Sequence, residues 1–358
     1  MITTSRSAVA TRKLCPMKRY WAYHALHPQV PVEAQRGGLT PVVSANGSAT
    51  QRGTLIHALL EAGMRGQDLD EAFQEACPPD MPQEQAVLAR RAAKGWMRVR
   101  GQSLRAAYRP VSTEEEWLWA MSPMVTQQLR MDVVLRHAAT GGLLILDYKT
   151  MATMDRTWEM RMLASDQTHL YIQALTERTE ELVQMQYEAI IVGRKDQDMQ
   201  KSPFVSAYPI GDMWVPHYQK GRSRASTLHW SDDEWLEWAD THALWSELYA
   251  TTGPLRPTNA QLLATKNATA HAELQWANTL AQLEEVADNP ELLAWRRESL
   301  IERNSESCAK FGMGYICAYS GLCWEGHQVD EENFVPRVDH HLTEQRATGS
   351  VDAVEETS

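Results

Sequence analysis

Two short apolar stretches that carry acidic residues decide the fold: Met131-Asp132-Val133-Val134-Leu135 and Leu146-Asp147-Tyr148-Lys149-Thr150. Both are typical of buried strands, and the run Ala138-Ala139-Thr140-Gly141-Gly142 predicts a hairpin turn between them. Residues i and i+2 of a strand share a face, so Asp147 and Lys149 point the same way. A loop at 138–141 places Asp132 opposite Asp147, and a loop at 139–142 places it opposite Lys149. Either register brings two carboxylates and an ammonium together on one surface.

This cluster predicts a metal-dependent site. Two carboxylates that lie close together need a cation to neutralise them, and Mg²⁺ prefers one or two carboxylates together with water and phosphate oxygens. A lysine beside such a metal helps to activate a water molecule or to hold the charge of a phosphate. The pattern therefore indicates hydrolysis of phosphodiesters. The alternative is a surface Asp–Lys pair on an edge strand next to an unrelated Asp132.

The sequence around the cluster predicts an α/β fold with the order helix, strand, strand, strand, helix, strand. Ser165 and Asp166 are expected to begin the helix that follows the hairpin. We also expect helical structure around Cys15-Pro16 within residues 1–30. The expected helices are 53–64, 82–107 and 165–175, and the expected strands are 116–121, 128–136, 143–149, 183–192 and 205–210.

Several motifs occur in an order that resembles the RecB-like branch of the PD-(D/E)XK nuclease superfamily, especially its phage-encoded members. They are Gly53-Thr54-Leu55-Ile56-His57 followed by Glu61, then Asp132, Asp147-x-Lys149 and Gln167-x-x-x-Tyr171. The resemblance covers residues 10–225 and 300–325. It implies an αβββαβ nuclease core, in which helices flank a mixed sheet.

The resemblance also implies a role for each matching residue. Asp132 and Asp147 would be the principal ligands of Mg²⁺ or Mn²⁺, and Lys149 would be the catalytic lysine. His57 would be a further ligand or would orient the attacking water, whereas Gln167 and Tyr171 would contact DNA or brace the site. Glu115 or Glu116 could supply another acidic ligand, but the run 114–116 is interpreted as a solvated charged segment.

The implied activity is hydrolysis of DNA by activated water. The resemblance favours an exonuclease on single strands or DNA ends, acting in recombination, repair or phage replication. The alternative is a DNA-binding subunit that works mainly as a partner of a helicase or an annealing protein. A recombination or replication protein is therefore an expected partner besides DNA.

Three of the five cysteines lie within sixteen residues, which favours metal ligation over disulfides in a chain without an evident secretion signal. The set resembles the iron–sulfur staple of AddB-type and CRISPR-associated RecB-like nucleases, which ties the two ends of the nuclease domain together. The resemblance implies a [4Fe–4S] cluster, and Zn²⁺ is the alternative. Cys77 is interpreted as structural. The implied ligands are Cys15, Cys308, Cys317 and Cys323.

Charge and composition give further expectations. The net charge of −11 argues against nonspecific coating of nucleic acid. Residues 85–113, however, contain seven basic residues and no acidic one. A DNA-facing surface there is expected to include Arg91, Lys94 and Arg98, although a solvated charged helix is the alternative. No apolar run is long enough to span a membrane, and a cytoplasmic location is expected, in the host cytoplasm if the chain is phage-encoded.

The expected organisation has four parts. Residues 1–225 form the nuclease core, 226–300 a helical insertion, 301–328 a Cys-rich segment that closes onto the N-terminus, and 329–358 an acidic tail without stable structure. Within the insertion, aromatic residues recur at intervals of three and four, which predicts one aromatic helix face. This face is expected to pack on the main domain and not to stack on bases. Its members are Trp235, Trp238, His242, Trp245 and Tyr249.

Overall fold

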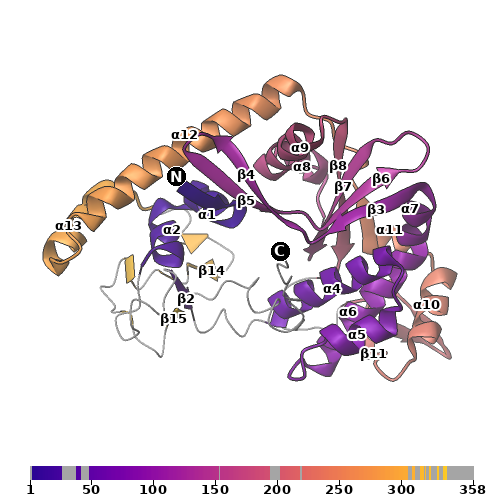
Figure 1. The fold of residues 1–358 in the computed structure, drawn as a ribbon. Helices are drawn as coiled ribbons and strands as arrows, with labels where there is room; N and C mark the ends of the chain where they lie inside the picture. Colours follow the sequence, from indigo (N-terminus) through magenta and orange to yellow (C-terminus); the bar gives the residue numbers. More distant parts are fainter. Residues whose placement is uncertain are drawn as a thin grey trace, which may run out of the picture. The chain divides into compact units, whose positions relative to one another are not determined.

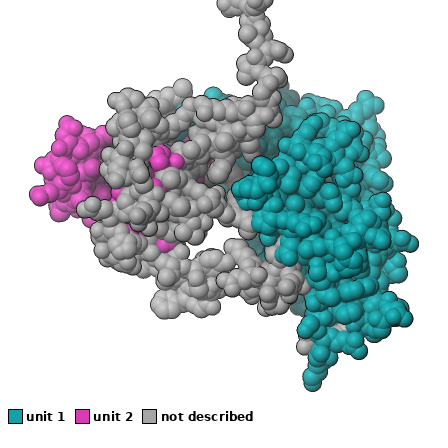
Figure 2. Space-filling view, turned by 90° about the horizontal axis from the view of Figure 1, so that it is seen from below, with its two compact units in different colours: residues 1–3, 48–272 teal, residues 4–47, 273–358 magenta. Residues whose placement is uncertain are grey.

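The structure is a computed structural model that describes residues 2–25, 38–41, 48–152, 154–193, 202–217 and 220–304. It also describes short pieces further along the chain, at 309–310, 315–317, 319, 322–323, 329 and 334–336. The chain divides into two compact units, which Figure 2 colours separately. The first consists of residues 1–3 and 48–272, and the second of residues 4–47 and 273–358. The second unit thus unites segments from both ends of the chain.

A five-stranded sheet forms the centre of the first unit (Figure 1), with the strand order β12-β8-β7-β6-β3. β7 and β8 run parallel, whereas the other neighbouring pairs are antiparallel, so the sheet is mixed. This confirms the predicted α/β class. The bounds of the strands are β3 Tyr108–Thr113, β6 Val133–His137, β7 Leu143–Met151, β8 Val183–Ile191 and β12 Tyr249–Thr251.

The hairpin formed by β6 and β7 has the first of the two predicted registers. Val133 pairs with Leu146, and the backbone N–H of His137 donates to the carbonyl of Gly142. Gly141 has a φ of 76°, in the left-handed region that glycine enters without a steric cost. The loop therefore consists of residues 138–141.

The single strand expected at 128–136 is wrong, because the chain forms two strands there. β5 (Val125–Arg130) pairs with β4 (Glu116–Ser122), and β6 begins only at Val133. β1 (Ile2–Ser5), whose first residues belong to this unit, completes a separate sheet of order β1-β5-β4. The chain changes sheets at Met131 and Asp132, which puts Asp132 directly before the first residue of β6, an interior strand of the central sheet.

Helices cover both faces of the central sheet (Figure 1). On one face, α4 and α6 pack apolar side chains against Leu144, Leu146 and Tyr148 of β7. α8 and α9 lie on the other face. The expected helices are thus present, and a π-helical turn at Met97–Gly101 joins α6 to α7. The bounds are α4 Ser48–Arg65, α5 Leu69–Ala76, α6 Gln83–Trp96, α7 Gln102–Ala107, α8 Trp158–Leu163 and α9 Asp166–Thr179.

The aromatic segment does not form one continuous helix. α10 (Asp232–Thr241) ends before a turn at Ala243, whose φ is 50°, and a short α11 (Trp245–Leu248) follows. Tyr249 then begins strand β12, which pairs with β8. Trp235 and Trp238 are buried in the main core, which confirms the packing interpretation. The chain before α10 forms a separate small sheet of order β10-β9-β11. Its strands are β9 Ser206–Ile210, β10 Met213–Val215 and β11 Ala225–Ser226.

The second unit joins the two ends of the chain by buried polar contacts and strand pairing. Arg19 is 3% exposed and donates to both carboxylate oxygens of Glu273, at 2.8 and 2.7 Å. β2 (Leu39–Pro41) pairs with β15 (Phe334–Pro336). The other elements are α1 Arg6–Leu14, α2 Pro16–Tyr23, the end of α12 (Asn259–Glu284), α13 Pro290–Leu300, β13 Ala309–Lys310 and β14 Tyr315–Ile316.

Candidate active site

The candidate site lies at the start of β6, next to the middle of the neighbouring strand β7. Because Val133 pairs with Leu146, the next position outward sets Asp132 opposite Asp147. The Asp132 carboxylate reaches the neighbouring strand, where its Oδ2 accepts a 2.8 Å hydrogen bond from the backbone N–H of Tyr148. This hydrogen bond fixes one carboxylate, at the start of β6, against the backbone of the D-x-K strand.

Helix α4 brings His57 to this carboxylate. His57 Nδ1 lies 3.4 Å from Asp132 Oδ2. The imidazole also packs edge-on against the Tyr148 ring, with 5.8 Å between the ring centroids. One turn earlier, a Cβ atom on Gly53 would lie 3.4 Å from Thr150 Oγ1, so the first turns of α4 run close to β7. The start of α4 therefore lies beside the end of β7, which brings the histidine of the G-x-x-x-H motif near Asp132.

Asp147 and Lys149 form an ion pair on the face of β7 opposite to Tyr148. Asp147 is 2% exposed, and its Oδ2 pairs with the Lys149 ammonium. Its other oxygen, Oδ1, accepts a 2.5 Å hydrogen bond from Gln167 Nε2 of α9. The Lys149 side chain remains 30% exposed. The arrangement leaves the lysine within reach of a substrate while both oxygens of the aspartate are held.

The two residues of the Q-x-x-x-Y motif are buried, at 5% exposure for Gln167 and 4% for Tyr171. The Tyr171 hydroxyl donates to the Arg130 carbonyl at 2.7 Å, just before the chain changes sheets. Gln167 therefore fixes the Asp147 carboxylate, and Tyr171 fixes the segment that carries Asp132. This geometry is that of bracing residues.

Glu114 belongs to the same cluster, although the sequence assigned it to a solvated run. Ligand atoms of His57, Glu114 and Asp132 all lie within 4.8 Å of one another. Glu114 has a φ of 51°, and its N–H donates to the Asp132 carbonyl at 3.0 Å. It also pairs with Arg130 at the base of the β4–β5 hairpin. Its neighbours Glu115 and Glu116 are exposed, as expected for a solvated segment.

The charges of the site match a divalent cation. Burial, followed by the negative charge of Asp147, raises the pKa of Asp132 above the usual value for an aspartate. His57, Lys149 and the Tyr148 N–H oppose this shift without overcoming it. The neighbouring cations therefore do not fully offset the burial and the negative surroundings of Asp132, and Mg²⁺ or Mn²⁺ would supply further positive charge. One imidazole and two carboxylates are also a suitable donor set for such an ion.

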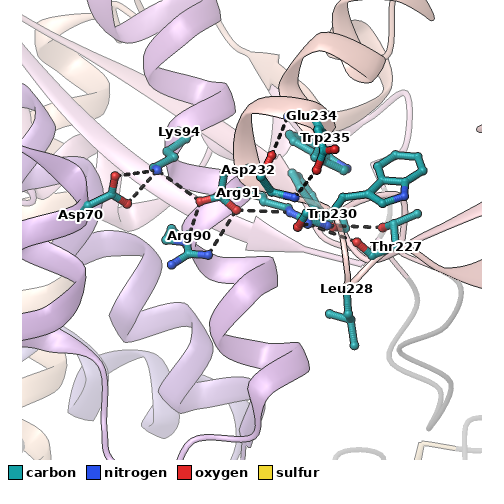
Figure 3. A network of polar contacts seen from close by, with 12 residues as sticks. Asp70, Arg90, Arg91, Lys94, Thr227, Leu228, Trp230, Asp232, Glu234 and Trp235 are labelled. Atoms are coloured by element: carbon teal, nitrogen blue, oxygen red, sulfur yellow. Dashed lines mark hydrogen bonds and ion pairs between the residues drawn. The ribbon is translucent and has the colours of Figure 1, made fainter.

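The expectation that Arg91 faces DNA is wrong. Arg91 has no exposed surface. Its guanidinium donates to the carbonyls of Phe204 and Trp230, both at 2.8 Å, and Figure 3 shows it enclosed between α6 and the segment before α10. A side chain committed in this way cannot reach a phosphate. The alternation of small and charged residues in α6 did not reveal which charge points inward.

Lys94 and Arg98 lie nearer to the surface. Lys94 Nζ is 2.7 Å from Asp70 Oδ1 and 3.1 Å from Asp232 Oδ2 (Figure 3). The Arg98 side chain is 50% exposed and pairs with Asp240. A role of these two residues in DNA binding remains a prediction.

The described cysteines of the predicted cluster share one environment within the second unit. Cys15 and Cys323 belong to a single buried apolar cluster, and Cys317 packs against it. The Asn304 N–H points to Cys15 Sγ at 3.5 Å. Cys308 lies outside the described residues. Cys77 belongs to the first unit, where it packs against the main core.

Asp132 lies just before β6, Asp147 and Lys149 lie within β7, and His57 of α4 lies beside Asp132. Such a group of side chains is suited to metal-dependent hydrolysis of phosphodiesters. The family model of the PD-(D/E)XK nuclease superfamily matches residues 3–324. The chain therefore belongs to the PD-(D/E)XK nuclease superfamily, whose members use divalent metals such as Mg²⁺ or Mn²⁺. No curated protein matches the chain. Among the residues described, no helix is long and apolar enough to cross a membrane.

Proposed function

We propose that the protein is a DNA nuclease of the RecB-like branch, and that it acts as an exonuclease on single strands or DNA ends. The observation that supports this most is the gathering of His57, Glu114 and Asp132 within 4.8 Å, next to the ion pair of Asp147 and Lys149. Recombination, repair or phage replication would provide its substrate. These assignments extend the superfamily membership to a substrate and a mode of cleavage.

The residues have distinct proposed roles. His57, Asp132, Glu114 and Asp147 would hold Mg²⁺ or Mn²⁺, which when bound polarises the phosphate and lowers the pKa of a bound water. Lys149, partly exposed, would face the phosphodiester and offset the negative charge that develops on it. Gln167 keeps the Asp147 carboxylate in a fixed orientation, and Tyr171 fixes the bend that carries Asp132.

A cleavage assay with a matched variant tests this proposal. Wild-type protein should shorten end-labelled single-stranded DNA with Mg²⁺ or Mn²⁺ present, and EDTA should stop the reaction. Asp147→Asn should lower the rate by at least about 10³-fold while the circular dichroism spectrum is unchanged. Asp212→Asn, at an exposed aspartate after β9, should cleave like the wild type. Circular single strands should resist an exonuclease but not an endonuclease.

Two outcomes would contradict the proposal. If Asp147→Asn cleaves like wild type, the site assignment is wrong. If the wild type binds DNA tightly yet never cuts it with either metal, the protein is better described as a DNA-binding subunit that serves a helicase or an annealing protein.

We further propose that Cys15, Cys308, Cys317 and Cys323 hold a [4Fe–4S] cluster. The support is the joint burial of Cys15 and Cys323, which come from opposite ends of the chain, with Cys317 beside them. A cluster at this place would stabilise the second unit by closing a very long loop, worth on the order of 5–6 kcal/mol by analogy with a disulfide.

Metal analysis separates the cluster from its alternatives. Anaerobically purified protein should be brown and contain about four irons per chain. Cys317→Ser should lose the colour and lower the melting temperature, whereas Cys77→Ser, a change in the other unit, should do neither. Colourless protein with one zinc per chain would replace the cluster by a zinc staple and leave the nuclease proposal standing.

A further inference from the structure

A buried tyrosine lies directly beneath the candidate catalytic lysine. Lys149 Nζ is 5.4 Å from the centroid of the Tyr187 ring. Tyr187 belongs to β8, where the parallel register sets it beside Asp147, and it has no exposed surface. A cation at this distance from an aromatic face is attracted by the ring, and the attraction grows when both groups are shielded from water.

The hydroxyl of Tyr187 is held by the first turn of α9. Tyr187 Oη lies 3.0 Å from Thr168 Oγ1 and 3.4 Å from Ser165 Oγ. Since the Thr168 hydroxyl donates its proton to the Met162 carbonyl, Thr168 Oγ1 must accept from Tyr187. Thr168 directly follows Gln167, which holds Asp147. One tyrosine therefore touches the lysine by its ring and the helix that orients the aspartate by its hydroxyl.

We propose that Tyr187 is a positioning residue for Lys149. The lysine side chain has several rotatable bonds and samples many conformations when nothing restrains its ammonium. The Tyr187 ring face restricts the ammonium to the side of β7 on which Asp147 lies. The hydroxyl contributes mainly to fixing the ring. This inference rests on the proposed function, because it takes Lys149 as the catalytic lysine.

The role of the Tyr187 ring in positioning Lys149 can be tested by replacements that keep the shape of the side chain nearly unchanged. Tyr187→Phe removes the hydroxyl and keeps the aromatic face, so it should retain kcat within about threefold. Incorporating 3,4,5-trifluorophenylalanine at position 187 withdraws charge from the ring face. We expect kcat to fall by about 3- to 10-fold relative to Tyr187→Phe, with KM unchanged, because Lys149 is 30% exposed and the attraction of a partly exposed cation to a ring corresponds to about this range. Thermal melts should show both proteins folded.

A matched control is Tyr249, another buried tyrosine, whose strand β12 also pairs with β8. Its hydroxyl donates to the Ala92 carbonyl. The same two replacements at position 249 should leave the trifluorinated protein with the kcat of Tyr249→Phe. A loss of kcat there as large as at position 187 would show a general effect of fluorination and overturn the inference.

The result for Lys149→Met separates the two proposals. If Lys149→Met cleaves DNA like wild type, the proposed function is wrong, and the role of Tyr187 is overturned with it. If Lys149→Met is inactive but the trifluorinated protein equals Tyr187→Phe in kcat, only the inference about Tyr187 is overturned. A fall in kcat with fluorination, together with an inactive Lys149→Met, supports both.

Discussion

Arg91→Met tests whether this arginine is a structural residue of the first unit and not a DNA contact. The wild-type guanidinium connects α6 to the segment before α10 (Figure 3). Methionine keeps much of the apolar stem and removes every donor. Asp232, which also contacts Arg91, retains Arg90 at 2.6 Å and Lys94 at 3.1 Å, so no carboxylate is left without a cation.

The expected loss of stability follows from the acceptors that Arg91 leaves behind. The carbonyls of Phe204, Thr227 and Trp230 lose hydrogen bonds of 2.8, 3.2 and 2.8 Å. A buried acceptor without a partner costs about 1–3 kcal/mol. Burial lowers the pKa of Arg91, a sign that its charge is poorly solvated, and removing the charge recovers part of that cost. Three such acceptors, offset in part by the removed charge, should lower the free energy of unfolding by about 3–5 kcal/mol in total.

Urea unfolding followed by tryptophan fluorescence measures this loss, and Trp235 of the same unit lies near the substituted side chain. Arg98→Met is the matched control, because its exposed pair with Asp240 is expected to contribute at most about 1 kcal/mol. A loss below about 1 kcal/mol for Arg91→Met would refute the structural role. So would a flatter dependence of DNA affinity on salt, measured where the variant remains folded.

Three further predictions concern other parts of the chain. Glu114→Gln should raise the calorimetric Kd for Mn²⁺ by about 10-fold or more, whereas Glu116→Gln, at an exposed neighbour, should not; equal Kd values would remove Glu114 from the site. Burial, and then the charge of Arg19, lower the pKa of His24 to about 4. Below pH 6.5 the unfolded chain therefore binds a proton that the folded chain does not bind. The free energy of unfolding of the second unit should fall by up to about 3 kcal/mol as the pH is lowered from 6.5 to 4. A His24→Gln variant with the same pH dependence would contradict that cause. Arg98→Ala should flatten the log–log salt dependence of single-strand binding by about 0.7 if Arg98 contacts one phosphate, and an unchanged slope would leave it a solvated residue.

Much of the fold was predictable because its strands and helices follow simple local patterns. The apolar run of β7 and the Gly141-Gly142 turn predicted the hairpin and limited its register to two, of which the structure has the one with the loop at 138–141. Ser165 begins α9 as the sequence indicated, with its side chain accepting from the Thr168 N–H. The aromatic segment was harder, because intervals of three and four persist across a break. A left-handed residue at Ala243 ends the helix, and no periodicity of side chains reports such a backbone change.

The candidate site was predictable only where its residues lie on regular elements. Asp147 and Lys149 sit two residues apart on one strand, and this spacing alone predicted that they share a face. His57 lies on a helix and was expected at the site only from the resemblance. Glu114 gave no such signal, since it stands between two strands of different sheets and has a left-handed backbone. The β4–β5 hairpin separates Glu114 from Asp132 in sequence. The Glu114 N–H nevertheless donates a hydrogen bond to the Asp132 carbonyl, which joins the two ends of the segment that contains this hairpin. Because the chain leaves the central sheet for the β4–β5 hairpin and returns at β6, Glu114 lies beside Asp132 at the start of β6, next to the histidine. This hairpin therefore helps to form the proposed metal site, and a chain shortened at it would be expected to lose Glu114 from the site even with every motif residue intact.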